Sequence, residues 1–357
     1  MSEWLMSYMK KRAAVIDTAI LEYLNDKTSE RYLMRLLGRS GYKYDAEAVL
    51  KSVILPANYL LGLGGKRWRS ILMLEVVEAL GKNPDNYIEF SIIPEMVHNG
   101  TLIHDDVEDN SEMRRGAPAV HRKFSIDVAL NLGDFMYYFP MVALLETKKL
   151  TERSRMKMIA IYHKNMLKVS LGQAIDIAWH GQLVDLNRIS EEEYLQMAYM
   201  KTGALSCMAA QLGAVIGGAD DPLIAALGNF GASLGVAFQL EDDLLNITQS
   251  KLSEGKGGVG EDIKEGKVSL LVIHALQHAR PNDKKRLINV LSEHTSDAKK
   301  IENAITVIEG SGAPDYIRSL KERLLNAAWR GIDKKLPDSE AKRRMRALSQ
   351  FLINRSI

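Results

Sequence analysis

The spacing of apolar residues along the chain predicts a protein built almost entirely from helices. Over long stretches, apolar side chains recur every three or four residues, which places them on one face of a helix. Examples are Ile88, Ile92, Ile93, Met96, Val97 and Ile103, and near the end Met345, Leu348 and Leu352. Alternating patterns typical of strands are scarce. We therefore expect an all-α fold.

Glycine and proline residues mark where these predicted helices end. They gather in short segments at residues 63–65, 115–118, 217–218, 255–260, 310–314 and 336–338. No linker rich in proline, serine or glycine divides the chain, and no segment repeats at a fixed period. We expect one domain over residues 1–357, a bundle of ten or more helices. The segment 255–260 is interpreted as a loop, with a plain linker as the alternative.

The overall composition narrows the class of protein. The chain has 46% hydrophobic residues, and its 47 Lys and Arg nearly balance its 45 Asp and Glu. A large core is therefore possible, and the charge gives no reason to propose nucleic acid or a membrane surface as partner. The single cysteine, Cys207, cannot form an intrachain disulfide. We expect a cytoplasmic protein with neither a secretion signal nor a membrane span.

Two acidic clusters suggest the chemistry of the protein. The first reads Leu-Ile-His-Asp-Asp-Val-Glu-Asp and the second Phe-Gln-Leu-Glu-Asp-Asp-Leu-Leu-Asn. Asp105 and Asp109 are one helical turn apart and project from one face, and the second cluster repeats this spacing from Asp242 to Asn246. Oxygen ligands without histidine or cysteine favour magnesium, which shares its coordination with substrate phosphates. One cluster alone would more simply be a solvated acidic turn, but two matching clusters predict a phosphorylated substrate.

Basic residues accompany these clusters. Residues 64–69 read Gly-Gly-Lys-Arg-Trp-Arg, which places three cations after a glycine break, and Arg114 and Arg115 follow the first cluster. A diphosphate needs donors besides metal, and such cations can supply them. Each cation taken singly is more simply a solvated group at a helix end. Their position beside the acidic clusters favours diphosphate binding.

Taken in order, five motifs closely resemble those of the trans-isoprenyl diphosphate synthase, or polyprenyl synthetase, family. They are Gly-Gly-Lys-Arg-Trp-Arg, Leu-Ile-His-Asp-Asp-Val-Glu-Asp, Arg-Arg-Gly-Ala-Pro, Lys-Thr-Gly and Phe-Gln-Leu-Glu-Asp-Asp, from about Gly64 to Lys267. The segments 98–101 and 108–111 are most similar to geranylgeranyl diphosphate synthases, as is Asn246, where many relatives have aspartate. The resemblance implies a helical bundle around a central substrate cavity, and a homodimer.

The resemblance implies that isopentenyl diphosphate condenses head to tail with dimethylallyl, geranyl or farnesyl diphosphate. Diphosphate leaves, and the product is a trans-polyprenyl diphosphate. Geranylgeranyl diphosphate is the expected product. Three magnesium ions would be bound mainly by Asp105, Asp109 and Asp242, with support from Asp106, Asp243 and Asp262. The allylic diphosphate would be bound by Arg114, Lys201, Thr202, Gln239, Lys256 and Lys267. Isopentenyl diphosphate would be bound without metal by Lys66, Arg69, His98 and Arg115.

The resemblance implies that product length depends on the size of the residues that precede the first aspartate cluster on the same helix. Gly100 and Thr101 lie about 6 to 7.5 Å below the carboxylates, at roughly 1.5 Å of rise per residue. Family members that stop at fifteen carbons usually have aromatic rings there, so this tunnel should remain open and Gly100→Phe should shorten the product. Met96 lies further along the same helix, deeper in the tunnel, and is a candidate to limit the length of the product. Tyr137 and Tyr138 resemble the aromatic floor of this tunnel in some geranylgeranyl synthases, although ordinary helix packing would also explain them. We expect a twenty-carbon product.

Three alternatives remain at this point. A terpene cyclase also ionises diphosphates with metal but needs no second diphosphate site, which Lys66, Arg69 and Arg115 would form. A non-catalytic subunit of a heteromeric synthase would typically have damaged aspartate clusters. A di-iron protein is suggested by Glu95 and His98, three residues apart, but that class uses two such pairs. His98 could also be a plain buried histidine.

Overall fold

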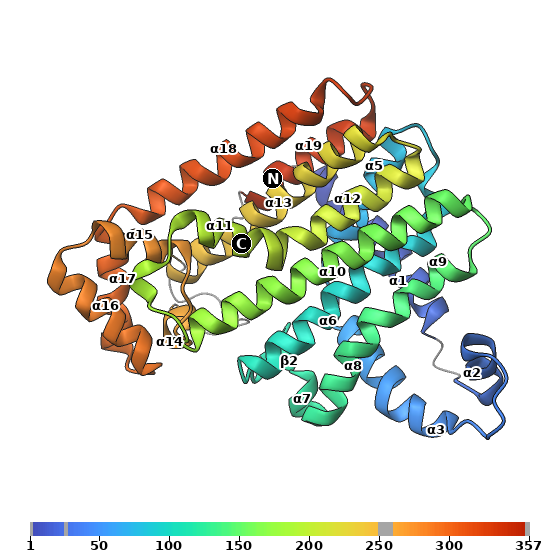
Figure 1. Ribbon diagram of the computed structural model, residues 1–357, viewed down its shortest axis with the longest axis horizontal. Helices are drawn as coiled ribbons and strands as arrows, with labels where there is room; N and C mark the ends of the chain where they lie inside the picture. Colours follow the sequence, from blue (N-terminus) through green and yellow to red (C-terminus); the bar gives the residue numbers. More distant parts are fainter. Residues whose placement is uncertain (1–2, 25–27, 249–259, 354–357) are drawn as a thin grey trace. The chain divides into compact units, whose positions relative to one another are not determined.

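The protein is described by a computed structural model over residues 3–24, 28–248 and 260–353 (Figure 1). In these residues the chain begins with α1 (Glu3–Tyr23), α2 (Glu30–Leu37), α3 (Ala46–Val49), η1 (Leu50–Ile54), α4 (Leu55–Gly62), α5 (Trp68–Ala79), η2 (Pro84–Ser91), α6 (Ile92–Glu108), the strands β1 (Met113–Arg114) and β2 (Ala117–Pro118), α7 (Val120–Lys123), α8 (Ile126–Tyr138), η3 (Phe139–Met141) and α9 (Val142–Glu146). It continues with α10 (Glu152–His180), η4 (Leu186–Arg188), α11 (Glu191–Ala198), η5 (Tyr199–Gly203), α12 (Ala204–Gly217), α13 (Asp221–Thr248), α14 (Glu261–Lys264), α15 (Leu270–His278), α16 (Pro281–Glu293), α17 (Ala298–Gly310), α18 (Ala313–Asp333) and α19 (Glu340–Ile353). The prediction of an all-α fold is confirmed.

The chain divides into two compact units. The first comprises residues 1–160 and 212–219, and the second comprises residues 161–211 and 220–357. Helices α10 and α12 contribute residues to both units. The single domain over the whole chain stays a prediction.

Helix α5 is the centre of the first unit. Its residues from Trp68 to Val77 are all buried, as expected for a helix that is covered on every side. It packs against α1, η2 and α6, and α6 in turn packs against α8. A Cβ added at Gly100 of α6 would lie 3.0 Å from the carbonyl oxygen of Gly133 on α8. The two helices therefore cross at a distance that favours glycine on α6.

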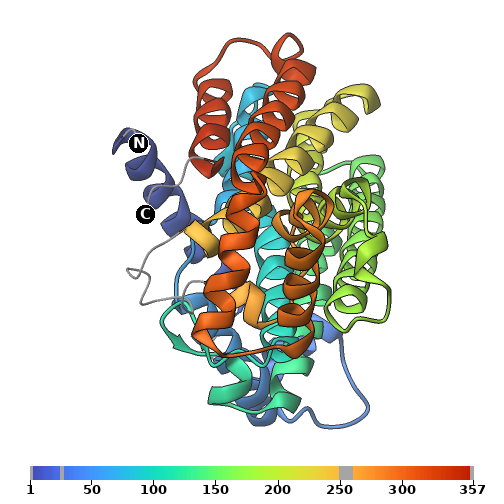
Figure 2. The same cartoon turned by 90° about the vertical axis from the view of Figure 1, so that its left-hand side faces the viewer.

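Helix α13 is the main apolar element of the second unit. It packs along α18, which also contacts α15 and α17 (Figures 1 and 2). Buried side chains such as Leu240 and Leu244 join residues of α15, α16 and α18 in one hydrophobic cluster. Cys207, on α12, is also buried, and burial raises the pKa of its thiol.

Two stretches are long and apolar enough to cross a membrane, judged by length and composition in the described part of the chain. They are Ile126–Glu146 and Asp221–Ile247, and 44% and 61% of their most apolar windows are buried inside the protein. Core helices of this length pass the same criterion, because a buried helix needs an apolar surface. The absence of a membrane span stays a prediction.

Candidate active site

The first acidic cluster lies at the C-terminal end of α6. Asp105 and Asp106 belong to its last turn, and Asp109 is the capping residue that follows Glu108. The backbone carbonyls at this end carry partial negative charge, so carboxylates are electrostatically unfavourable here. The position therefore favours a bound cation more strongly than a cluster in the middle of a helix would.

Asp106 is engaged with the protein's own Arg114. It is 1% exposed, and Arg114 Nε donates to its two carboxylate oxygens at 2.9 and 3.1 Å, with a further bond from Nη2. Burial raises the pKa of Asp106, and the bonded guanidinium acts in the opposite direction. Asp106 thus orients Arg114, one of the predicted allylic diphosphate ligands.

Arg114 and Arg115 are presented by the β1–β2 hairpin. Its two central residues, Arg115 and Gly116, have φ angles of +54° and +78°, which is the geometry of a tight type I′ turn. Arg115 Nη1 donates to the backbone oxygen of Gly64. This bond joins the hairpin to the loop of residues 64–67, where Lys66 is exposed.

His98 lies among four guanidinium groups. Burial lowers the pKa of its imidazole well below the ordinary value, and nearby guanidinium groups lower it further; they belong to Arg69, Arg115, Arg114 and Arg67. Its Nδ1 is buried and has no hydrogen-bond partner in the described residues. Arg69 itself lies 4.5 Å from the centre of the Trp68 ring. Arg67 and Arg114 are paired with Glu95 and Asp106, so Arg69, Arg115 and the neutral imidazole are the groups that suit a polyanionic ligand.

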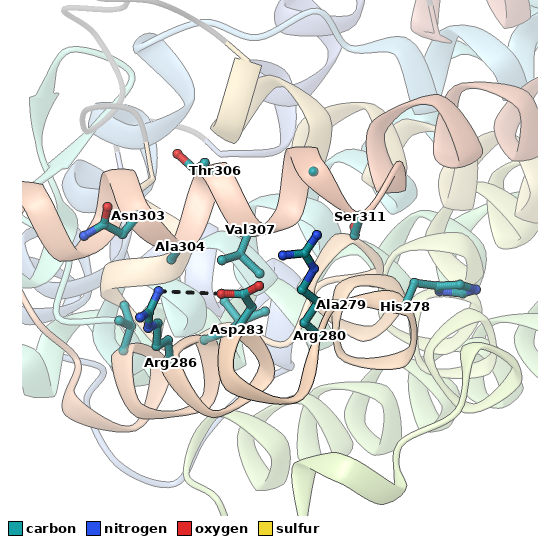
Figure 3. A pocket seen from close by; sticks show the side chains of 13 residues that line it. His278, Ala279, Arg280, Asp283, Arg286, Asn303, Ala304, Thr306, Val307 and Ser311 are labelled. Carbon is teal, nitrogen blue, oxygen red and sulfur yellow. Dashed lines mark ion pairs between the residues drawn. The ribbon is translucent and has the colours of Figure 1, made fainter.

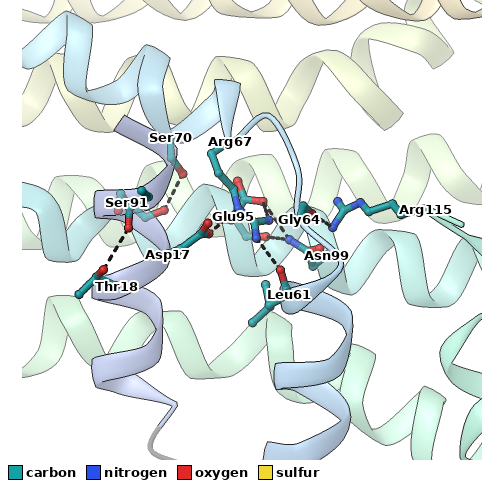
Figure 4. A network of polar contacts seen from close by, with 11 residues as sticks. Asp17, Thr18, Leu61, Gly64, Arg67, Ser70, Ser91, Glu95, Asn99 and Arg115 are labelled. Atoms are coloured by element: carbon teal, nitrogen blue, oxygen red, sulfur yellow. Dashed lines mark hydrogen bonds and ion pairs between the residues drawn. The ribbon is translucent and has the colours of Figure 1, made fainter. Parts of the chain in front are cut away.

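Glu95 lies one helical turn before His98, and its carboxylate is engaged with protein side chains. Its carboxylate accepts hydrogen bonds from Arg67 at 2.6 Å and from Asn99 at 3.0 Å (Figure 4). The di-iron alternative therefore finds no support, because Glu95 is occupied by a guanidinium group.

The second acidic cluster lies near the C-terminal end of α13. Asp243 is 5% exposed and accepts hydrogen bonds from Tyr194 at 2.6 Å and from the side-chain amide of Gln239 at 2.9 Å. Burial, with Asp262 next in importance, raises the pKa of Asp243 to about 7. Thr202 donates to Gln239 at 3.0 Å, so two predicted allylic ligands and Asp243 form one chain of hydrogen bonds.

The predicted lysines of the second unit also have acidic neighbours. Lys201, on η5, pairs with Asp176 of α10 at 2.5 Å. A Cβ added at Gly172 would lie 2.4 Å from the backbone nitrogen of Lys201, so only glycine lets α10 approach η5 this closely. Lys267 pairs with Glu265 at 2.6 Å.

Asp262 lies close to Lys267 and to the end of α13. Its carboxylate is 3.7 Å from Lys267 Nζ, and its backbone N–H donates to the side-chain oxygen of Asn246 at 3.3 Å. Asn246, which is not among the predicted magnesium ligands, therefore helps to position Asp262. Lys256 lies outside the described residues.

The acidic residues suit magnesium. Among the described residues, no group of three or more His, Cys, Asp or Glu side chains is arranged to bind a metal ion alone. Magnesium needs no such cage, since it commonly takes one or two carboxylates and completes its coordination with water and substrate phosphates. The carboxylates of Asp105 and Asp109 at the end of α6, and that of Asp242 on α13, are each oxygen donors of the kind that magnesium takes.

The residues proposed to set chain length occupy different environments. Met96 is 1% exposed, Thr101 donates to the backbone oxygen of His98, and Tyr138 is 77% exposed. A Cβ at Gly100 would lie 2.9 Å from the Tyr137 ring, so Gly100 is packed against α8. Gly100→Phe would therefore disturb the contact between these helices, and Thr101 gives a cleaner test of product length.

Sequence reasoning missed several residues that support the site. Asp176 and Tyr194 bond to the predicted ligands Lys201 and Asp243, and Asp17 bonds to Arg67. A visible signal existed at Asp176, which is a charged side chain between Ile175 and Ile177. Such a group needs a partner when it is buried, but the sequence does not say which one.

A separate groove lies between α16 and α17 (Figure 3). Its volume is about 690 Å³, and Arg280, Asp283, Arg286 and Thr306 are among its lining residues. It contains none of the residues predicted for the active site.

Comparisons with known proteins agree with these features. The sequence model described as polyprenyl synthetase matches residues 51–308. The short chain isoprenyl diphosphate synthase of Methanothermobacter thermautotrophicus is 31% identical over 359 residues, covering 98% of both chains. The geranylgeranyl diphosphate synthase of Saccharolobus solfataricus is 32% identical over 300 residues, covering 83% of this chain and 88% of that protein.

A solved structure gives the same result for the fold. The crystal structure of geranylgeranyl pyrophosphate synthetase from Pyrococcus horikoshii matches with a TM-score of 0.85 and 27% identity, covering 99% of each chain. The chain therefore belongs to the polyprenyl synthetase family of trans-isoprenyl diphosphate synthases and is a prenyltransferase.

Proposed function

We propose that the protein condenses isopentenyl diphosphate with an allylic diphosphate and that its main product is geranylgeranyl diphosphate. The observation that carries this proposal is the bond from Arg115 to Gly64, which joins the hairpin that follows the first acidic cluster to the loop that carries Lys66 and leads to Arg69. A terpene cyclase has no need for a second diphosphate site of this kind. The function of the relatives named above supports the same reaction.

The metal is proposed to be magnesium, bound by Asp105, Asp109, Asp242 and Asp262 together with the allylic diphosphate. When bound, it would neutralise the charge that develops on the leaving diphosphate. Asp106 and Asp243 are better suited to positioning, because their oxygens already accept hydrogen bonds from protein side chains. The number of ions stays a prediction.

The protein's own side chains have two tasks in the proposed reaction. Arg114, Lys201 and Lys267 would bind the allylic diphosphate and stabilise its added negative charge as the carbon–oxygen bond breaks. Lys66, Arg69, Arg115 and the neutral His98 would hold isopentenyl diphosphate so that its double bond faces the allylic carbon. The proton lost from the adduct would pass to the released diphosphate, so no general base is assigned.

The test supplies labelled isopentenyl diphosphate, magnesium and either dimethylallyl, geranyl or farnesyl diphosphate. Product lengths are then measured by chromatography, and we expect twenty carbons from each starter. Condensation to a different length would leave the reaction in place and overturn the product assignment. No condensation with any starter would overturn the proposed function.

We further propose a cytoplasmic homodimer. Support for self-association comes from α10, where Met156, Leu167 and Leu171 lie on one helical face and are each about half exposed or more. Exposed apolar side chains in a row are typical of protein interfaces.

A further inference from the structure

Arg67 lies within the loop that carries the predicted isopentenyl diphosphate ligands, yet its side chain is directed into the protein. It is 3% exposed. Nε donates to Asp17 of α1 at 2.8 Å, Nη1 to Glu95 of α6 at 2.6 Å, and Nη2 to the backbone oxygen of Leu61 on α4 at 2.8 Å (Figure 4). Each nitrogen of the guanidinium group thus bonds to a different helix. Arg67 is therefore an internal connector of three helices.

The backbone at Arg67 is in a conformation that suits glycine better. Arg67 precedes α5 with a φ of +48° and a ψ of +23°, in the left-handed region that side chains with a Cβ disfavour. Glycine at this position would remove that strain. The presence of arginine is therefore explained by the contacts of its side chain and not by the shape of the loop.

The connector lies close to Arg115, one of the predicted binding groups. A Cβ added at Gly65 would lie 3.1 Å from Arg67 Nη1 and 3.4 Å from Arg115 Nη2, so the two guanidinium groups flank one glycine. Burial lowers the pKa of Arg115, Arg67 lowers it further, and Glu95 acts in the opposite direction. Glu95 therefore offsets the repulsion between these cations before any substrate is bound.

We propose that Arg67, Glu95 and Asp17 form a positioning unit for the isopentenyl diphosphate site. The unit fixes the loop so that Lys66 and Arg69 keep their spacing relative to the hairpin that carries Arg115. Helix α1, which contains none of the recognised motifs, takes part through Asp17. This inference rests on the proposed function, since it assigns the loop to the homoallylic substrate. Preorganised donors of this kind lower the cost of binding an anion.

The first experiment replaces Asp17, the exposed carboxylate that bonds to Arg67. The Asp17 side chain is 44% exposed, so Asp17→Asn should leave the fold intact. We expect KM for isopentenyl diphosphate to rise about fivefold, with KM for the allylic substrate and kcat unchanged. The matched control is Asp85→Asn, which removes the exposed ion pair between Asp85 and Arg12 of α1 and should change neither KM.

The second experiment removes the buried ion pair as a unit. Arg67→Met/Glu95→Met leaves no unpaired buried charge, whereas either single change would. We expect KM for isopentenyl diphosphate to rise about tenfold or more, with partial recovery in Arg67→Lys. Titration calorimetry of isopentenyl diphosphate without metal should show the same loss of affinity, and circular dichroism should show an unchanged helix content.

The outcomes separate the two proposals. Unchanged calorimetric affinity and KM in the folded double variant would overturn the positioning unit, as would an equal rise in both substrate KM values. If the double variant fails to fold, Asp17→Asn against Asp85→Asn decides the matter. A wild-type protein that binds isopentenyl diphosphate but never condenses it would overturn the proposed function and leave the positioning unit standing.

Discussion

Some residues at this site are predicted to bind a ligand, and others position those residues. The sequence did not distinguish these two roles. Asp106 and Asp243 belong to the recognisable aspartate clusters, which the sequence placed on helices. Their partners were not predicted, because Arg114 is 8 residues from Asp106 and lies on strand β1, and Tyr194 is 49 residues from Asp243. Bonds of this kind are made only when separate elements pack together.

The protonation of Asp243 should be linked to folding. Burial raises its pKa from the ordinary 3.8 of an aspartate to about 7 in the folded protein, so the native state binds a proton more tightly. Its contribution to stability is therefore fully present below about pH 4 and is lost as the pH rises towards 7. Asp243→Asn lacks this dependence. In metal-free protein, urea unfolding should show wild type losing stability relative to Asp243→Asn over this range.

A matched control for this pH series is Asp315→Asn. Asp315 is an exposed aspartate on α18, with its side chain 89% accessible. The difference in unfolding free energy between wild type and Asp315→Asn should therefore stay nearly constant as the pH changes. If the stability difference between wild type and Asp243→Asn also stayed constant over this pH range, the raised pKa of Asp243 would be contradicted.

At the scale of elements, the hydrophobic pattern predicted the helices well because burial follows the helical period. The breaks at residues 217–218 and 310–314 coincide with the ends of α12 and α17. The pattern did not reveal that Ile88 belongs to the short 3₁₀ segment η2, which begins at Pro84, or that residues 113–118 form a hairpin. Short segments contain too few residues to show a period.

The crossing of α6 and α8 should be sensitive to a single methyl group. In Gly100→Ala the new Cβ would lie 3.0 Å from Gly133 O and 3.1 Å from Met136 Cβ, so the helices must shift. We expect a loss of about 1 to 3 kcal/mol in the free energy of unfolding, measured with urea. Gly331→Ala on α18, where nothing lies within 4 Å, should instead be neutral or stabilising. Equal stability of the two variants would contradict this crossing.

Product length should respond to Thr101 on the same helix. Thr101 is partly exposed, so it can accept a larger ring with less disturbance of the α6–α8 contact than Gly100. We expect Thr101→Phe to move the main product from twenty carbons towards fifteen, measured by chromatography of the dephosphorylated prenols. Thr101→Val, which keeps the size of the side chain, should leave the distribution unchanged. An unaltered product in Thr101→Phe would remove Thr101 from the tunnel wall.

At the scale of the whole molecule, the two acidic clusters belong to different units of the chain. The first is in the unit of residues 1–160 and 212–219, and the second is in the other unit. The order of motifs predicted that both serve one reaction, since the family resemblance spans them. Sequence patterns report local burial and spacing and do not fix distances between remote segments, so this part of the prediction depended on resemblance.

Self-association should depend on the exposed apolar face of α10. Leu167 is 62% exposed and Leu171 is 49% exposed, one turn apart. We expect wild type to have twice the chain mass of 39.9 kDa by light scattering, and Leu167→Asp/Leu171→Asp to have the mass of one chain. Leu183→Asp, at an exposed leucine beyond the end of α10, is the control and should remain a dimer. A dimeric double variant would exclude this face as the interface.

The burial of Cys207 has a practical consequence for spectroscopy. Because the one native thiol is enclosed and its pKa is raised, it should react slowly with thiol-specific reagents. Cysteines introduced at the exposed Glu108 and Lys264, beside the two acidic helix ends, would then take up paramagnetic tags selectively. Pulsed electron resonance between those tags would measure how far apart the clusters lie in solution, before and after diphosphate is added.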